Sequence, residues 1–538
     1  MRTIIFLIIL WVLSVTASFA QLDRPYEPVV IKGEALPHFL NFEISHLYLF
    51  RYQSSSDKWE MMPFQFDEVN PKDQDSMYFK PDDSFGRLDE DDELVFLLKD
   101  LGDQASALSW LVGADTLRYE LRFCDPLDGK HGFAYLYFLP TIPGPIPEPY
   151  QMRYDAASDR VHSLNYEVGF NRTGQLADVL IKSGSNTDIF DRLKIRVLGW
   201  LLVVPVFLHE DYVEMQYAYA KVGPVRVIRN LYGRFYWKQM HFDEKFTQTS
   251  FFYPWNGSFK LVEIPIDDAV DVGAKVDLLR ISWDFNRNST GMKFYSETNR
   301  SGAIIDAMPD AIDHACTPDM LNWAMGTGDP GTMLNIFYVP PLGDQIELYY
   351  YDNSDGKTAD PGLKVDTGDS LSFGDNGFSL QKHIEQYAAA ESTLDVVYYN
   401  FFLPPNFGPD EASLLCAQLN FPVEITAKLD TFGVSTKISQ LNLFSPDQFF
   451  LPQNYPNPFN ASTAILVNLS RPTKIKLQIF DAMGRLVDTL VDELLPSGRH
   501  EFLWHGKDRN GTPLPSGIYF CQAATQGSFS RIKMLLIK

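Results

Sequence analysis

Cysteine is scarce in this sequence of 538 residues, which contains only Cys124, Cys316, Cys416 and Cys521. None of them belongs to a CxxC pair, so the sequence supports neither a zinc site nor a thioredoxin-like motif. In an exported chain Cys316 and Cys416 could form one disulfide, and buried free thiols are an equally good interpretation. Cysteine is therefore not what holds this fold together.

Long apolar runs are also few. Residues 1–20 combine a positive start, an uncharged apolar stretch and small residues before position 21, which is the pattern of a cleaved signal peptide. The apolar stretch of about a dozen residues is shorter than the ~20 that span a bilayer. Residues 197–208 are the most apolar internal run, but a glycine and a proline interrupt them, which predicts a buried strand pair. We therefore expect export and no transmembrane helix in the mature chain.

Basic residues are outnumbered, with 46 Lys and Arg against 69 Asp and Glu and a formal charge of −23. Residues 451–538 differ, because they hold 10 basic and 6 acidic residues and leave 36 and 63 to the first 450. A body this acidic repels nucleic acid, which we do not expect as a partner. Its charge is compatible with divalent cations, although a solvated surface is the simpler explanation.

Helical periodicity is nearly absent. Short runs of Val, Ile, Phe and Tyr bounded by Gly, Pro, Asn and Asp recur along the chain, which predicts an all-β fold. Strand candidates include residues 46–52, 94–98, 116–123 and 133–138, and the clear helix candidate of the body is 410–419. A chain of this length exceeds one ordinary core. We predict a multidomain β-sandwich protein.

Two breaks divide the sequence. Five prolines in residues 140–149 indicate a stiff extended spacer, and the run SPDQFFLPQNYP separates the acidic body from the basic tail. The expected units are a signal peptide (1–20), an N-terminal β-domain (21–139), a proline-rich linker (140–149), a central β-sandwich region of one or two sandwiches (150–444), a second linker (445–455) and a C-terminal domain (456–538).

Residues 454–538 carry the most specific pattern. They open with NYPNPFN and continue into KIKLQIFD, where Ile475, Leu477 and Ile479 share one face of a strand. The loop GKDRNG at residues 506–511 is rich in residues that tolerate positive φ. The chain ends in SGIYF and an edge strand, RIKMLLIK. Six or seven strands in this length predict an immunoglobulin-like sandwich.

These motifs resemble the type A C-terminal sorting domain of type IX secretion cargo, and the related flagellar-hook-cap-like immunoglobulin module is nearly indistinguishable. The matching motifs are NYPNPFN, L-x-I-F-D-x-x-G, W-x-G-x-D-x-x-G, SGIYF and a final strand containing lysine. Ala461 and His505 depart from the usual proline and aspartate. The resemblance implies a bacterial protein that the type IX machinery carries to the cell surface or the medium. It implies sorting-motif roles for Asn457, Pro458, Phe459, Gly484, Gly517, Tyr519 and Lys538.

An acidic segment of the body offers a candidate metal site. Asp89, Asp91 and Glu93 alternate in residues 86–103, which follow the run PFQFDE at residues 63–68. Hard oxygen ligands of this kind can bind Ca²⁺, although the spacing is not that of an EF-hand. An acidic turn before the strand at 94–98 is the alternative.

Catalytic patterns are weak, and GxSxG, HExxH and phosphate-binding glycine loops are absent from the sequence. Three clusters place a histidine near a carboxylate, namely His209-Glu210-Asp211, His241 with Asp243 and Glu244, and Asp313-His314. Adjacent residues of a strand point to opposite faces, so we expect ordinary surface or turn residues here.

Aromatic clusters are compatible with contact with a glycan or a cell-surface polysaccharide, although we expect most of their rings in the core. They lie at residues 235–237, 251–255, 349–351 and 398–402, and aromatic faces can stack on sugar rings when they point outward. The run GPVRVIR at residues 223–229 is similar to short segments of large β-sandwich proteins related to polysaccharide-active enzymes. Two functions stay open: a surface protein that binds glycan, protein or Ca²⁺, and a secreted polysaccharide lyase or hydrolase.

Overall fold

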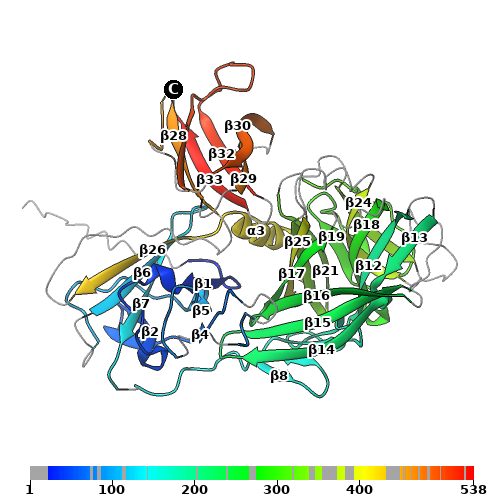
Figure 1. Cartoon of the computed structure of the whole chain (residues 1–538), viewed down its shortest axis with the longest axis horizontal. Coiled ribbons are helices and arrows are strands. Elements are labelled where there is room, and N and C mark those ends of the chain that lie inside the picture. Colours follow the sequence, from blue (N-terminus) through cyan, green and yellow to red (C-terminus); the bar gives the residue numbers. More distant parts are fainter. Residues whose placement is uncertain are drawn as a thin grey trace, which may run out of the picture.

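The protein is described by a computed structural model of the chain (Figure 1). The described residues are 22–538 without 73–76, 81–85, 112–116, 142, 202–203, 238–239, 266–273, 318–319, 339–345, 354–371, 382–392, 432–448, 452–453, 455, 461, 470–472, 482–484, 497 and 526–528. The expected signal peptide at 1–20 and most of the expected linker at 445–455 lie outside them. The chain is mainly β-strand, as the sequence predicts.

The N-terminal region contains two small antiparallel sheets around a common core. One sheet has the order β26 (Glu424–Thr431), β6 (Leu117–Cys124), β7 (His131–Phe138), β2 (Leu47–Gln53) and β3 (Lys58–Met61). The other has the order β1 (Pro28–Lys32), β5 (Glu93–Leu97) and β4 (Gln65–Asp67). The four predicted strands at 46–52, 94–98, 116–123 and 133–138 are confirmed with ends shifted by one or two residues.

Strand β26 reaches this sheet from the far end of the body. It pairs antiparallel with β6 along its length, from Glu424 opposite Cys124 to Thr431 opposite Leu117. Its side chains Ile425 and Ala427 are buried in the N-terminal core. The N-terminal unit is thus larger than residues 21–139, and the span 150–444 includes a strand that does not belong to the central sandwich.

The central region is a sandwich of a nine-stranded and a five-stranded sheet. The larger sheet has the order β14 (Val213–Val222), β15 (Val227–Trp237), β16 (Met240–Phe252), β17 (Asn256–Pro265), β25 (Thr393–Leu403), β22 (Gly331–Tyr338), β21 (Asn322–Gly328), β19 (Lys293–Ser296) and β20 (Ala303–Ile304). The smaller has the order β13 (Val204–His209), β12 (Phe190–Leu201), β18 (Ala274–Phe285), β24 (Ser372–Gln381) and β23 (Ile346–Asn353).

Aromatic and amide side chains connect the two sheets. Phe337 of β22 stacks on Phe378 of β24 with ring centroids 4.8 Å apart. Beside them Asn400 donates to Asn335 at 2.8 Å, and Asn335 donates to Asn376 at 3.1 Å, so buried amides bond across the sandwich. A smaller sheet of β11 (Leu176–Ile181), β10 (Tyr166–Phe170), β9 (Arg160–His162) and β8 (Arg153–Asp155) packs on the same core.

The predicted strand pair at residues 197–208 exists as the hairpin of β12 and β13, with Leu198 opposite Phe207. It is less buried than expected, because Leu198 and Phe207 are only half-buried and Trp200 is 43% exposed. The hairpin lies at the edge of the smaller sheet, where its outer strand has a neighbour on one side. Among the described residues no helix is long and apolar enough to cross a bilayer.

The helix predicted at residues 410–419 is confirmed as α3 (Pro409–Asn420). Its proline occupies the first turn and Asp410 and Glu411 follow, which suits the positive end of the helix dipole. At the other end the Arg24 guanidinium donates to the carbonyl oxygens of Gln418 and Phe421 at 2.9 and 2.6 Å. The described part of the chain also contains the short helices η1 (Gly33–Ala35), η2 (Ile44–His46), η3 (Leu98–Asp100), η4 (Glu210–Tyr212) and η5 (Arg287–Ser289).

All four cysteines are free thiols. Cys416 is buried on α3 against β21 and β22, and its Sγ contacts the carbonyl oxygen of Leu321 at 3.4 Å. Cys316 and Cys416 therefore do not form the disulfide that the sequence left open, and both are unpaired thiols. Burial raises the pKa of the Cys416 thiol, so this side chain acts as a small apolar group.

The C-terminal domain is an antiparallel sandwich with its own core, which Figure 1 shows above the body. One sheet has the order β27 (Phe449–Phe450), β28 (Thr463–Leu469) and β31 (Gly498–Trp504). The other has the order β30 (Leu486–Leu495), β29 (Thr473–Asp481), β32 (Gly517–Ala524) and β33 (Phe529–Leu536). Ile475, Leu477 and Ile479 are all fully buried. β33 is the outer named strand of its sheet, as the sequence predicts, and Phe459 forms a parallel bridge to its Leu536.

Candidate functional site

The segment Asn457-Pro458-Phe459 of the C-terminal domain lies against β33, the last strand of that domain. The Asn457 side chain donates to the carbonyl oxygen of Lys533 at 3.1 Å and accepts from the N–H of Leu535 at 2.8 Å. Phe459 adds two backbone bonds of 2.9 Å, donating to Leu535 and accepting from Ile537. The Asn457–Pro458 peptide is cis. Residues 457–459 therefore act as a short parallel extension of the sheet.

The aromatic residues of the separate motifs meet in one cluster. The ring of Trp504 lies 5.5 Å from that of Phe459 and 5.4 Å from that of Tyr519, and all three side chains are buried. Trp504 donates its indole N–H to the carbonyl oxygen of Lys507 at 3.0 Å, and Tyr519 donates its hydroxyl to that of Pro515 at 2.9 Å. Buried aromatic rings with satisfied polar atoms fix the turns around them.

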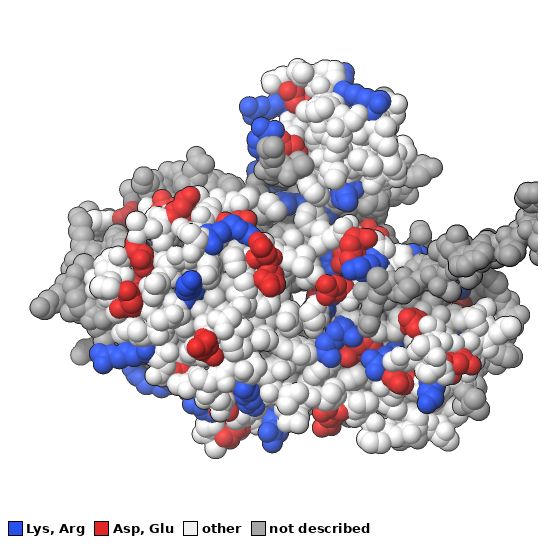
Figure 2. All heavy atoms as spheres, turned by 180° about the vertical axis from the view of Figure 1, so that it is seen from behind, with Lys and Arg blue, Asp and Glu red and all other residues white. Residues whose placement is uncertain are grey.

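Two further residues of the sorting motif, Gly517 and Lys538, lie at the same end of the β32–β33 pair, where Gly517 is opposite Leu536. Gly517 begins β32, and the backbone N–H of Lys538 donates to the hydroxyl of Ser516 at 2.9 Å. Gly484 lies outside the described residues. Lys533 and Lys538 are exposed, and on the face shown in Figure 2 both the C-terminal domain and the body carry basic and acidic side chains.

Residues 457–528 match the family of the FlgD Ig-like domain. This match identifies the C-terminal domain as an immunoglobulin-like domain and leaves the body unassigned. No curated protein matches the sequence.

Solved structures give only distant similarity. An α-mannosidase from Enterococcus faecalis V583 aligns with 87% of this chain and 57% of its own at 9% identity and a TM-score of 0.35. A glycosyl hydrolase family 38 protein from Enterococcus faecalis covers 88% and 59% at 10% identity and a TM-score of 0.34. Dimeric latent PorU from Porphyromonas gingivalis covers 80% and 34% at 13% identity and a TM-score of 0.16. This chain thus spans less than two thirds of each relative, and scores this low do not show a shared fold.

In the body, the predicted calcium ligands belong to two different sets of contacts: an acidic turn and an ion pair. The Asp89 carboxylate accepts the backbone N–H of Asp91 at 2.9 Å, and the Asp92 carboxylate accepts that of Asp89 at 2.9 Å, so this acidic turn is held by its own side chains. Glu93 instead pairs with Arg226. Within the described ranges, Asp89, Asp91 and Glu93 do not form a group close enough to share an ion. Calcium binding stays a prediction.

Arg226 unites two runs that the sequence leaves unexplained, PFQFDE and GPVRVIR. Its guanidinium bonds to the carboxylates of Asp67 and Glu93 at 2.8 and 2.6 Å and to the hydroxyl of Tyr253 at 3.2 Å. Gln65 accepts the backbone N–H of Arg226 at 2.8 Å. All five side chains are buried, and burial raises the pKa of Tyr253. This cluster joins β4 and β5 to β15, so it is a structural junction.

The three histidine–carboxylate clusters have different outcomes. His209, Glu210 and Asp211 converge, contrary to our expectation for consecutive residues. His314 does not converge with Asp313, because its ring bonds to the carbonyl oxygen of Leu348 at 2.9 Å while Asp313 accepts a backbone N–H at 2.9 Å. The side chains of the cluster at residues 241–244 lie outside the described part of the structure.

The aromatic clusters mostly belong to the core. Tyr350 and Tyr398 are 4% and 1% exposed, and Tyr398 stacks on Phe259 with centroids 5.0 Å apart. Phe252 is fully buried beside the same ring of Phe259, at 5.3 Å. The side chains of residues 235–237 are outside the described set. Rings packed in this way cannot stack on a sugar, so these clusters give no support to glycan contact.

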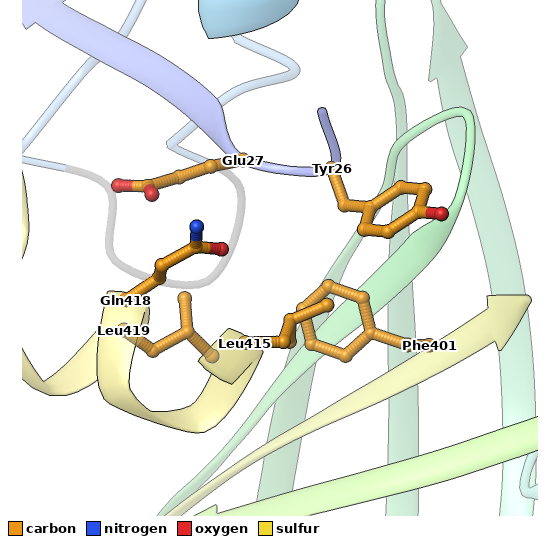
Figure 3. Close-up of a pocket in the computed structure, with 6 residues that line it drawn as sticks. All are labelled: Tyr26, Glu27, Phe401, Leu415, Gln418 and Leu419. Atoms are coloured by element: carbon orange, nitrogen blue, oxygen red, sulfur yellow. The ribbon is translucent and has the colours of Figure 1, made fainter. Parts of the chain in front are cut away.

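A small pocket lies between the N-terminal segment, α3 and β25 (Figure 3). It is lined by Tyr26, Glu27, Phe401, Leu415, Gln418 and Leu419. Its volume of 190 Å³ includes space open to solvent and is below the roughly 300 Å³ at which ligand pockets begin. Glu27 is the charged residue of its lining, and its carboxylate pairs with Arg24 at 2.7 Å. The pocket is therefore a packing gap beside the end of α3.

Proposed function

We propose that this protein is bacterial cargo of the type IX secretion system, in which residues 456–538 form the sorting domain. The family match at residues 457–528 supports the immunoglobulin-like part of this proposal. The main support is the convergence of Phe459, Trp504 and Tyr519, since separate sequence motifs are used to build one end of the domain.

In this proposal the body is a binding protein of the cell surface or the medium. In the described residues most rings of the aromatic clusters are buried, and the pocket beside α3 is smaller than an ordinary ligand pocket. A polysaccharide lyase or hydrolase would need outward rings above convergent acid and base groups. The binding function is therefore favoured over the enzymatic one.

The sorting proposal is tested in a bacterium with a type IX system by comparing the full chain with a chain lacking residues 457–538. We expect the full chain in the outer-membrane or medium fraction and the shortened chain in the periplasm. Leu494→Ala is the matched control, since Leu494 is 69% exposed on the same domain. Equal export of the shortened chain would refute the proposal.

The function of the body is tested separately with residues 21–444 on a glycan array and in a polysaccharide-degradation screen. We expect no cleavage of any polymer. Release of oligosaccharides would refute the binding function and show that the body is an enzyme.

A further inference from the structure

His209, Glu210 and Asp211 converge because the strand ends between them. His209 is the last residue of β13, and the next two residues belong to the short helix η4. This turn breaks the alternation of a strand, so the three side chains each place one ligand atom within 4.8 Å of the others. The imidazole Nδ1 of His209 lies 3.6 Å from the carboxylate of Asp211.

Glu210 supplies a second and independent observation. Its side chain is 1% exposed, and one carboxylate oxygen is bound by the Arg196 guanidinium and by the N–H of Ile195. The other oxygen, Oε1, has no hydrogen-bond partner and forms a longer ion pair of 3.9 Å with Arg192. A buried carboxylate oxygen without a donor is unfavourable. A cation bound at Oε1 would remove this penalty and leave the Arg196 pair intact.

We propose that His209, Glu210 and Asp211 bind one divalent transition-metal ion, with Zn²⁺ as the best match to the ligands. One imidazole and two carboxylates are the donors that Zn²⁺ accepts, and three protein ligands leave a fourth position for water. Tetrahedral bonds of ~2.0 Å put ligand atoms about 3.3 Å apart, close to the 3.6 Å between His209 and Asp211. Asp211 is 38% exposed, so the ion can enter from solvent.

The test uses the full-length mature chain after treatment with a chelator. Zn²⁺ binding is measured by calorimetry, and Co²⁺ is added in parallel because its visible absorption reports nitrogen and oxygen ligands. We expect one ion per chain, and a loss of affinity of at least tenfold in His209→Ala and in Asp211→Asn. Both positions are partly exposed, and circular dichroism checks that the variants stay folded.

The matched control is the pair Asp313→Asn and His314→Ala, which changes the same residue types where the structure does not bring them together. We expect Zn²⁺ affinity within twofold of the parent in these two variants. No binding to the parent chain, or undiminished binding to His209→Ala and Asp211→Asn, would overturn the proposal. An equal loss in the control pair would place the ion elsewhere and would also overturn it.

Discussion

The two junctions of this molecule are built differently. The N-terminal and central regions share β5, whose Leu94 and Phe96 enter the N-terminal core while Val95 and Leu97 enter the central core. Burial of each such side chain contributes about 1.5–3 kcal/mol. Since one strand serves both cores, and the buried Arg226 cluster lies at the end of it, we infer that these two regions unfold together.

The junction between the body and the C-terminal domain is less extensive. The ring of Phe421, just after α3, lies 5.2 Å from that of Phe520, and the Arg531 guanidinium lies 6.0 Å from Phe421. Among the described residues, the C-terminal core contains only members of its own domain. We infer that this domain folds independently of the body, which suits the sorting role proposed above.

The largest effect is expected for Arg226→Met. This change removes the guanidinium from the buried carboxylates of Glu93 and Asp67, of which Asp67 keeps an ion pair with Lys221 at 3.3 Å. The loss should cost the body about 3–5 kcal/mol. Urea denaturation followed by circular dichroism should show one earlier transition for the N-terminal and central regions together, and an unchanged transition for the C-terminal domain.

Arg87→Ala is the control for that experiment. Its ion pair with Glu43 is exposed on both sides, so its loss should cost less than about 1 kcal/mol. Separate transitions for the N-terminal and central regions in Arg226→Met would contradict the inference that they unfold together.

Trp504→Ala should destabilise the C-terminal domain and leave the body unchanged. Loss of a buried tryptophan costs about 3–5 kcal/mol, here confined to the C-terminal domain, and we expect reduced export as well. Leu503→Ala changes the neighbouring residue, which is 54% exposed, and should leave both the stability and the export unchanged. A body that unfolds earlier in Trp504→Ala would show that the two parts are coupled.

A smaller, pH-dependent effect is expected from Asp92, where burial raises the pKa from 3.8 to about 7. The folded chain then holds a proton that the unfolded chain releases above pH 4. The free energy of unfolding should therefore fall as the pH rises, by about 2 kcal/mol between pH 5 and 7.

Denaturation of Asp92→Asn over this pH range tests the assignment, with Asp91→Asn in the same turn as the control. The free energy of unfolding should fall less steeply with pH in Asp92→Asn than in the parent chain, and Asp91→Asn should behave like the parent. Parallel slopes for Asp92→Asn and the parent chain would remove Asp92 as the cause.

The smallest effect is expected for Phe421→Ala. An aromatic pair contributes about 0.5–1.5 kcal/mol, so the loss of the contact with Phe520 should change either transition by less than about 1.5 kcal/mol. Small-angle scattering should show that the C-terminal domain moves more freely relative to the body. A loss of several kcal/mol in both transitions would mean that the second junction is as extensive as the first.

Local patterns predicted the strands, the helix at residues 410–419 and the immunoglobulin-like C-terminal domain. Contacts distant in sequence were not accessible, because no local pattern reports that Glu93 meets Arg226 across 133 positions or that β26 pairs with β6. The sequence showed the acidic turn and the aromatic clusters, but it did not show which of their side chains are buried. The convergence of His209 with Asp211 was missed since it depends on a turn that begins immediately after a strand.

The central claim is that the C-terminal domain is an independent export address. Its most direct test attaches residues 449–538, behind a signal peptide, to a fluorescent protein that does not otherwise leave the periplasm, in a bacterium with a type IX system. We predict that the reporter reaches the cell surface or the medium, and that Trp504→Ala in the fusion retains it in the periplasm. Periplasmic retention of a folded, unaltered fusion would contradict the claim.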